Sequence, residues 1–357
     1  MEGAPPVGLT KRLELAFKHL VGWFFAWLAF SARRSARVRK LLTESKRVVL
    51  MRLDDRVGEA LLTTPLLEEL AGRGYEVTVV VHPKCARVLE GHPKASKVIP
   101  FDRSGWWMLP LAPGVRALHA VTEGAVVVNC SSWTEYSGTP ALISRFASPN
   151  GCVVGPKLGP AGELADEAVR PLDDTTSELK QRLHYLSVLG FDPGPPRLSF
   201  RVPRETERLK AFLGGLKTPY VVVNPGGRLG WRRVPSEVFR AACLELIRLG
   251  RTPVVTWGPG EESLARQTAP EGAVVAPPTD LDELAALMKG AELTVCNNTG
   301  PMHLSVAVGT KTLGLFLHMP VERWGHAAPH EMLDLTGAPK MDQRVTEELG
   351  RLLQSHS

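Results

Sequence analysis

The most constraining feature of this chain is the repeated alternation of short, valine-rich runs with longer amphipathic segments. Three such runs lie in the first half of the chain and three in the second. Apolar runs of four or five residues that lack regular polar alternation are typical of parallel strands buried on both faces. Each parallel strand needs a crossover, and the amphipathic segments can supply it as helices. The predicted strands are 47–51, 77–81, 125–129, 220–223, 253–257 and 293–296.

The two series of strands predict an α/β protein with two domains, because 357 residues exceed the usual size of a single core. A region rich in proline and glycine, 151–201, separates the two series. We therefore expect four parts: an N-terminal arm at 1–46, a Rossmann-like domain at 47–200, a second Rossmann-like domain at 201–335 and a C-terminal helical tail at 336–357.

Basic charge is concentrated in the arm. Residues 1–47 hold ten lysines or arginines and three acidic residues, whereas the whole chain has a formal charge of +6, so the remainder is close to neutral. A general basic surface is not required to explain the charge, and we expect no nucleic-acid partner.

The arm also contains an apolar run, 20–30, with five aromatic residues among its last eight. The uncharged stretch around it, 19–32, is shorter than the roughly 20 residues that a membrane-spanning helix needs. The basic cluster that follows argues against a signal peptide. We predict that residues 9–40 bind the membrane surface as an interfacial helix, and the alternative is a helix that packs on the protein itself.

The five cysteines are widely spaced and include no C-x-x-C pair. This pattern argues against a zinc site and a disulfide framework, and it fits a reducing compartment. We therefore expect no metal and no cofactor, and a cytoplasmic protein that lies on the inner face of the cytoplasmic membrane.

A candidate ligand site begins where the predicted strand 293–296 ends. Asn297-Asn298-Thr299-Gly300-Pro301 follows, and a helix then starts with His303 in its first turn. The free N–H groups of a helix start, at the positive end of its dipole, favour an anion such as a phosphate. The loops 224–233 and 258–261 follow two other parallel strands, so all three loops should open on one edge of the sheet.

Four sequence blocks follow one another along the chain: RLDDRVGEALLTTPLLEEL (52–70), NPGGRLGWRRVPSEVF (224–239), TWGPGEE (256–262) and CNNTGPMHLSVAVGTKTLGLF (296–316) with ERWG (322–325). Together they resemble glycosyltransferase family 9, the heptosyltransferase group that builds the inner core of lipopolysaccharide. The resemblance implies a GT-B architecture, in which two Rossmann-like domains with parallel sheets face a central cleft. It further implies inverting transfer of a sugar from a nucleotide-sugar, typically ADP-heptose, to a lipopolysaccharide core or related glycolipid, without an obligatory metal.

The resemblance assigns roles to two charged residues. Glu59 follows Gly58 where the family has its proposed catalytic aspartate, which implies a base for the acceptor hydroxyl. The alternative is an acid in a first helical turn that complements the helix dipole. Arg232 matches the phosphate-binding lysine of the family, and its alternative is a surface charge.

The remaining candidates bind the donor. Thr299, Gly300 and His303 match the family, and His303 is expected to face the diphosphate unless it is a buried structural histidine. Asn298 stands where the family usually has an aspartate that contacts the sugar hydroxyls. The sequence therefore does not identify the donor sugar. Glu261 is a candidate for the nucleotide ribose, with an ordinary acid at a helix start as its alternative.

Two motifs suggest other chemistries. The D-x-D at 280–282 is typical of metal-dependent glycosyltransferases, but it precedes an amphipathic helix, so we interpret Asp280 as a helix cap. The segment 258–260 lacks the third glycine of a dinucleotide fingerprint, which argues against a nicotinamide enzyme. Two further functions stay open: a non-catalytic relative that binds a nucleotide-sugar or acts as a scaffold, and a GT-B-like sugar-nucleotide epimerase.

Overall fold

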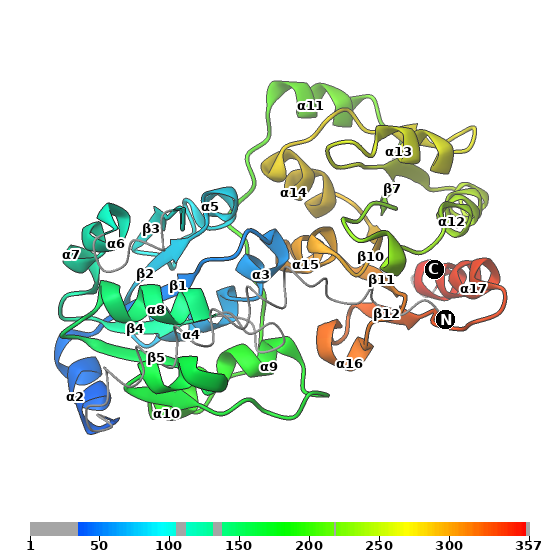
Figure 1. Ribbon diagram of the computed structural model, residues 1–357. Coiled ribbons are helices and arrows are strands. Elements are labelled where there is room, and N and C mark those ends of the chain that lie inside the picture. Colours follow the sequence, from blue (N-terminus) through cyan, green and yellow to red (C-terminus); the bar gives the residue numbers. More distant parts are fainter. Residues whose placement is uncertain (1–34, 105–111, 131–137, 218, 355–357) are drawn as a thin grey trace. The chain divides into compact units, whose positions relative to one another are not determined.

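The computed structural model describes residues 35–104, 112–130, 138–217 and 219–354 (Figure 1). The chain divides between Arg201 and Val202 into two compact units, called here the N-terminal and the C-terminal unit. Each unit is built on a six-stranded sheet in which every strand pairing is parallel. The predicted α/β class with two Rossmann-like sheets is confirmed.

The N-terminal sheet has the strand order β3-β2-β1-β4-β5-β6. The order reverses at β1, which pairs with β2 on one side and with β4 on the other. A ligand crevice of a doubly wound sheet lies at such a reversal, outside the carboxyl ends of the strands. The strands are β1 (Arg47–Arg52), β2 (Glu76–Val81), β3 (Lys97–Pro100), β4 (Val126–Asn129), β5 (Cys152–Pro156) and β6 (Glu167–Val169).

The helices of the N-terminal unit cover the two faces of this sheet. Pro65 occupies the first turn of α4, where its missing N–H would have no partner. The helices are α2 (Ser35–Ser45), α3 (Val57–Leu61), α4 (Thr64–Gly72), α5 (Pro83–Leu89), α6 (Pro113–Ala117), α7 (His119–Thr122), α8 (Gly138–Ala147), the 3₁₀ helix η2 (Gly159–Leu164), α9 (Glu178–Leu183) and α10 (Tyr185–Val188).

Helix α2 is the described part of the arm. Val38 and Leu42 are buried, and the helix contacts β4 and β5. Arg37 donates a hydrogen bond of 2.5 Å to the carbonyl of Asn150. This part of the arm therefore packs on the protein, whereas the apolar run at 20–30 lies outside the described residues. Among the helices that the structure describes, none is both long and apolar enough to cross a membrane.

The C-terminal sheet has the order β12-β11-β10-β7-β8-β9 and reverses at β7. The carboxyl ends of β7, β8 and β10 therefore lie side by side, as the sequence predicts. Strands β11 and β12 extend the sheet beyond the predicted runs; β12 has only two apolar residues between acidic ends, which gives no strand pattern. The strands are β7 (Tyr220–Asn224), β8 (Thr252–Val255), β9 (Val274–Val275), β10 (Leu293–Asn297), β11 (Thr312–Phe316) and β12 (Glu331–Asp334).

One helix of this unit, α14, starts where its sequence predicts. Asp280 caps α14 in a capping box with Glu283, which confirms the interpretation of the D-x-D motif as a helix start. Near the end of the chain, Val345 and Leu349 of α17 are buried in the core, where α17 contacts α12. The helices are α11 (Glu207–Gly214), the 3₁₀ helix η3 (Gly230–Arg232), α12 (Ser236–Arg248), α13 (Glu262–Thr268), α14 (Leu281–Lys289), α15 (Gly300–Ala307), α16 (Val321–Trp324) and α17 (Met341–Gln354).

Candidate active site

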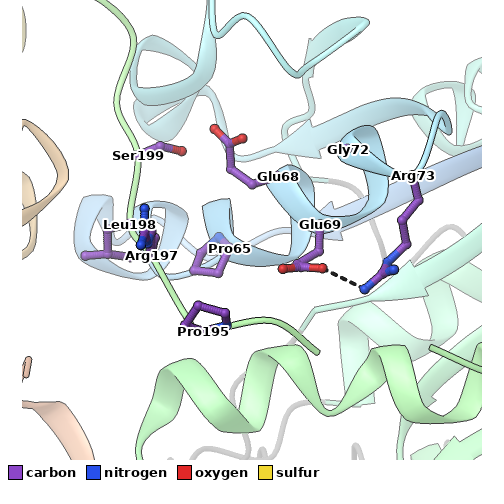
Figure 2. Close-up of a pocket in the computed structure, with 9 residues that line it drawn as sticks. All are labelled: Pro65, Glu68, Glu69, Gly72, Arg73, Pro195, Arg197, Leu198 and Ser199. Carbon is purple, nitrogen blue, oxygen red and sulfur yellow. Dashed lines mark hydrogen bonds and ion pairs between the residues drawn. The ribbon is translucent and has the colours of Figure 1, made fainter. Parts of the chain in front are cut away.

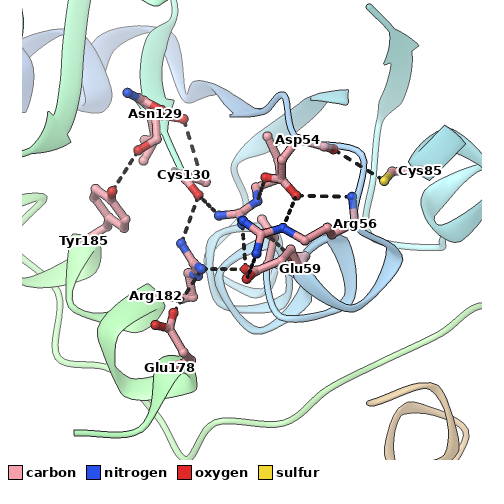
Figure 3. Close-up of polar contacts among 12 residues, drawn as sticks. Asp54, Arg56, Glu59, Cys85, Asn129, Cys130, Glu178, Arg182 and Tyr185 are labelled. Carbon is pink, nitrogen blue, oxygen red and sulfur yellow. Dashed lines mark hydrogen bonds and ion pairs between the residues drawn. The ribbon is translucent and has the colours of Figure 1, made fainter. Parts of the chain in front are cut away.

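A buried network of charged side chains lies at the carboxyl end of β1 (Figure 3). Glu59, in α3, is 4% exposed. Its Oε2 atom accepts hydrogen bonds from Arg52 Nη2 at 2.6 Å and from Arg182 Nη2 at 2.8 Å. Both arginines are fully buried, and two guanidinium groups this close stabilise the carboxylate form of Glu59.

The two arginines also tie the network to the end of β4. Each donates to the carbonyl oxygen of Cys130, and the bond from Arg182 Nη1 measures 3.0 Å. Tyr185 donates from its hydroxyl to the carbonyl of Asn129 at 2.7 Å. Burial raises the pKa of Tyr185 well above its usual value, so the hydroxyl keeps its proton and remains a donor.

Two further carboxylates complete the network. Asp54 Oδ2 lies 2.5 Å from Arg52 Nε, and Glu178 Oε2 lies 3.0 Å from Arg182 Nη2. Burial disfavours the charged form of Arg52, but the carboxylates of Asp54 and Glu59 outweigh burial and raise its pKa. Arg56 also belongs to the network, since its guanidinium lies 3.9 Å from Asp54 Oδ1 and 3.9 Å from Glu59 Oε1. Among the described residues, three guanidinium groups thus face three carboxylates.

Arg52, Arg182 and Glu178 were not singled out from the sequence. Arg182 lies 123 residues beyond Glu59, on α9, and no local pattern connects the two positions.

The sequence predicts that Glu59 acts as a base. A base requires a carboxylate, and the carboxylate of Glu59 is held by hydrogen bonds from Arg52 and Arg182. The role of Glu59 as a base stays a prediction.

In the C-terminal unit, Asn297 fastens the loop after β7 to the end of β10. Its side chain is buried. Oδ1 accepts from the N–H of Val234 at 3.0 Å, and Nδ2 donates to the carbonyls of Pro225 and Gly226 at 2.8 and 3.2 Å. The amide is satisfied in both directions, which explains why a polar residue can end a strand of the core here.

Glu261 fastens the loop after β7 to the loop after β8. Its Oε1 accepts from the N–H of Gly227 at 2.8 Å, and its Oε2 accepts from the N–H of Gly258 at 3.1 Å. A Cβ atom on Gly226 would lie 2.1 Å from Glu261 Oε2, so a larger residue there would displace the Glu261 side chain. Glu261 is the N-cap residue that precedes α13, but its side chain makes this loop contact and no capping hydrogen bond. Its predicted contact with a ribose is untested.

A pocket of about 380 Å³ opens between these two loops. Arg233 and Glu261 line it, with Arg233 Nη1 3.9 Å from Glu261 Oε1. Arg232, the predicted phosphate ligand, is the last residue of η3 and is partly exposed. Arg233, its neighbour, is thus the arginine that lines the pocket.

The segment after β10 brings the remaining predicted residues to the same edge. Thr299 precedes α15, its Oγ1 donates to the carbonyl of Asn297 at 3.2 Å, and its methyl group lies 3.1 Å from where a Cβ on Gly227 would be. Gly300 is the first residue of α15. Thr299, Glu261 and Arg233 therefore gather around the backbone of Gly227.

Asn298 is 6% exposed, and among the described residues its Nδ2 has no hydrogen-bond partner. Its backbone N–H is used, since it donates to the carbonyl of Leu315 at 3.0 Å. An unsatisfied buried donor costs free energy, on the order of 1–3 kcal/mol, and calls for an explanation such as a ligand acceptor.

His303 lies in the first turn of α15 and is buried. Its Nδ1 is 2.8 Å from Nε2 of His326, and the two rings meet edge to face at 80°. Burial, followed by the neighbouring His303 and His330, lowers the pKa of His326 to about 2. Burial also lowers the pKa of His330. His326 and His330 carry no motif of their own in the sequence, and only the fold brings them to His303.

A second hollow, of about 530 Å³, lies in the N-terminal unit between α4 and the segment 195–199 (Figure 2). Glu69 pairs with Arg73 at 2.8 Å, and Glu68 lies 3.7 Å from the ring of His92. Glu69 is therefore engaged by a basic group of the same unit, whereas burial lowers the pKa of His92 and disfavours a charged partner for Glu68.

Residues 181–349 match the family model for glycosyltransferase family 9 (heptosyltransferase). The resemblance to this family is confirmed. The matched region contains the three loops of the C-terminal unit, with Arg232, Glu261 and His303, and it also contains Arg182. The family match therefore supports the prediction that this protein is a glycosyltransferase. A search of curated proteins gave no match.

Solved structures show the same fold. The family 9 glycosyltransferase of Veillonella parvula DSM 2008 has a TM-score of 0.71 and 19% identity, over 87% of this chain and 97% of that chain. Heptosyltransferase WaaC of E. coli, solved with ADP, gives 0.64 and 19% over 87% and 97%. ADP-heptose lps heptosyltransferase II of E. coli gives 0.65 and 18% over 87% and 99%. At these identities the likeness establishes the fold, and the predicted pair of Rossmann-like units of a GT-B protein is confirmed.

Proposed function

We propose that this chain is an inverting glycosyltransferase that moves heptose from ADP-heptose to a lipopolysaccharide core or a related glycolipid. One observation carries the proposal: the family match coincides with the part of the chain in which three loops are fastened together at one sheet edge. The E. coli heptosyltransferase WaaC has been solved with ADP and with ADP-2-deoxy-2-fluoro heptose, which supports the choice of donor.

The donor would bind to the C-terminal unit. In this proposal Arg232 and the start of α15, with Thr299, Gly300 and His303, hold the diphosphate, because a guanidinium and a helix N-terminus both favour anions. Asn298 contacts the sugar, where its Nδ2 would find an acceptor. Glu261 accepts hydrogen bonds from two loops and so fixes the part of the site that would bind the nucleotide.

The acceptor would react at the N-terminal unit. Glu59 takes the proton of the acceptor hydroxyl, the freed oxygen forms a bond to the anomeric carbon, and the bond from that carbon to the diphosphate breaks. The electron pair leaves with ADP, whose charge Arg232 and α15 stabilise. Attack opposite the leaving group inverts the anomeric centre. We propose that Arg232 and the positive end of α15 take the place of a metal ion.

We further propose that the arm, residues 9–40, keeps the enzyme at the inner face of the cytoplasmic membrane, where a glycolipid acceptor is confined. Liposome flotation tests this with full-length protein and a variant that starts at Ser35. This variant keeps α2, whose Val38 and Leu42 belong to the buried core. We expect only the full-length chain to float, and equal partitioning would contradict the proposal.

Incubation of purified protein with ADP-heptose and a lipid A-type acceptor tests the reaction. We expect ADP and a glycosylated acceptor, with the same rate in EDTA. Donor binding without transfer would instead indicate the non-catalytic relative. Formation of an altered nucleotide-sugar without acceptor would indicate the epimerase.

A further inference from the structure

Arg182 reaches Glu59 from a distant segment of the chain. It lies on α9, is fully buried, and donates from Nη2 to Glu59 Oε2 at 2.8 Å (Figure 3). Arg52, at the end of β1, donates to the same oxygen atom at 2.6 Å. One carboxylate oxygen of Glu59 is therefore held by two guanidinium groups that come from two different elements.

The guanidinium of Arg182 is itself held in place. Its Nη1 donates to the carbonyl of Cys130 at 3.0 Å, and its Nη2 lies 3.0 Å from Oε2 of Glu178, one helical turn earlier in α9. Tyr185 of α10 donates to the neighbouring carbonyl, that of Asn129, at 2.7 Å, which fastens the next helix to the end of β4. A side chain that is fixed by such contacts can hold another side chain in a defined orientation.

Stability alone is a weak reason for a buried guanidinium. Removing this group from water is costly, and apolar side chains of similar size are often as stable as a buried ion pair. Glu59, for its part, has one more rotatable bond than the aspartate that the family resemblance implies at this position. Because more freedom is lost when such a side chain is fixed, more contacts are needed to keep it in one orientation, and Arg52 and Arg182 supply them.

We propose that Arg182 is a positioning residue that acts through Glu59: together with Arg52, it holds the Glu59 carboxylate in the orientation in which it meets the acceptor hydroxyl. The proposal rests on the proposed function, in which Glu59 is the base. Orientation of this kind matters for the rate, because a displacement of about 1 Å in the reacting groups can lower it about 100-fold. Arg182 itself exchanges no proton in this proposal.

The test uses Arg182→Lys in the full-length protein. Lysine keeps the positive charge but has a single nitrogen atom in place of the planar fork that serves Glu59 and Cys130 at once. Arg145→Lys is the matched control. Arg145, in α8 of the same unit, pairs with Asp166 at 2.8 Å and donates to the carbonyl of Gly151 at 3.2 Å, and none of these residues has a proposed part in the reaction.

In kinetics, Arg182→Lys should lower kcat about 10- to 100-fold, because Glu59 loses its fixed orientation. KM for ADP-heptose should change less than about twofold, since the proposed donor ligands belong to the C-terminal unit, and Arg145→Lys should leave both constants within about twofold of wild type. Circular dichroism checks that both variants are folded at the assay temperature.

A double-mutant cycle shows whether Arg182 acts through Glu59. When Glu59→Gln is already present, Arg182→Lys should lower kcat by less than about a further twofold, because a residue that acts through Glu59 loses its role together with it. A merely structural role of Arg182 would instead multiply the two losses.

Carbon-13 NMR of protein labelled at the glutamate carboxyl carbons reports on the contact without any substrate. The resonance that disappears in Glu59→Gln belongs to Glu59. We expect this resonance to move in Arg182→Lys, which changes the donors to its oxygen, and to keep its position in Arg145→Lys.

Near-normal kcat of Arg182→Lys would overturn the proposal, as would multiplied losses in the double variant, equal effects of Arg182→Lys and Arg145→Lys, or an unmoved Glu59 resonance. The two proposals fail separately. If the wild type transfers heptose and Arg182→Lys does so equally well, the proposed function stands and the role of Arg182 is wrong. If the Glu59 resonance moves as expected but the wild type transfers no sugar from ADP-heptose, Arg182 does hold Glu59 and the proposed function is wrong.

Discussion

Glu59 is proposed as the base and is also one of three carboxylates in a buried network, so a loss of activity in a variant has two possible causes. Comparison with Glu178 separates them. Glu178 is equally buried and pairs with the same Arg182, at 3.0 Å, but it lies on α9 and has no proposed part in the reaction. We therefore pair Glu59→Gln with Glu178→Gln.

Both substitutions should destabilise the protein to a similar extent. Each leaves a buried guanidinium with less opposite charge, and loss of one partner of a buried ion pair costs about 3–5 kcal/mol. Glutamine keeps the shape and one acceptor oxygen, so the lower end, about 3 kcal/mol, applies. The melting temperature should then fall by roughly 6–12 °C, from about 2–4 °C per kcal/mol for a unit of this size.

Their effects on the reaction should differ. A general base contributes roughly 10²–10⁴-fold to the rate, so Glu59→Gln should lower kcat at least about 100-fold, while Glu178→Gln stays within a few-fold of wild type. Turnover is measured with ADP-heptose and acceptor at a temperature at which circular dichroism shows both variants folded. Near-normal turnover of Glu59→Gln, or an equal loss in both variants, would refute the assignment of Glu59 as the base.

Three further predictions follow from the C-terminal unit. Gly226→Ala should displace Glu261 and weaken ADP binding about tenfold or more in calorimetry, since a Cβ would lie 2.1 Å from Glu261 Oε2; unchanged binding would show that the loop contact is dispensable. The pKa of His326 in the folded protein is about 2, below its ordinary value of 6.5. The free energy of unfolding should therefore fall as the pH drops below 6.5, and this residue should contribute about 1.4 kcal/mol per pH unit. His326→Phe should reduce that slope, as measured by urea unfolding at about pH 4–7. Asp280→Ala should lower the free energy of unfolding in urea by about 1 kcal/mol, because α14 loses its cap. Its kcat should stay within about twofold of wild type with EDTA present. A metal-dependent activity of the wild type that this substitution abolishes would contradict the capping role.

Sequence patterns within short segments were enough to predict much of this fold. Valine-rich runs between amphipathic segments indicated two parallel sheets, since burial on both faces leaves a signature along a few residues. Topology then placed the loops after β7, β8 and β10 at one edge. The Asp280 cap was also readable, because a capping box spans only four residues. The order of the four sequence blocks indicated the family.

Only the tertiary structure decided which polar groups meet. Arg182 reaches Glu59 across 123 residues, Glu261 bridges two loops, and His326 contacts His303. A sequence shows that a residue can donate or accept, but its partner depends on segments that the fold brings together. For the same reason the sequence indicated a carboxylate and a histidine at the right places, while the charge and the proton position of each depend on neighbours that only folding supplies.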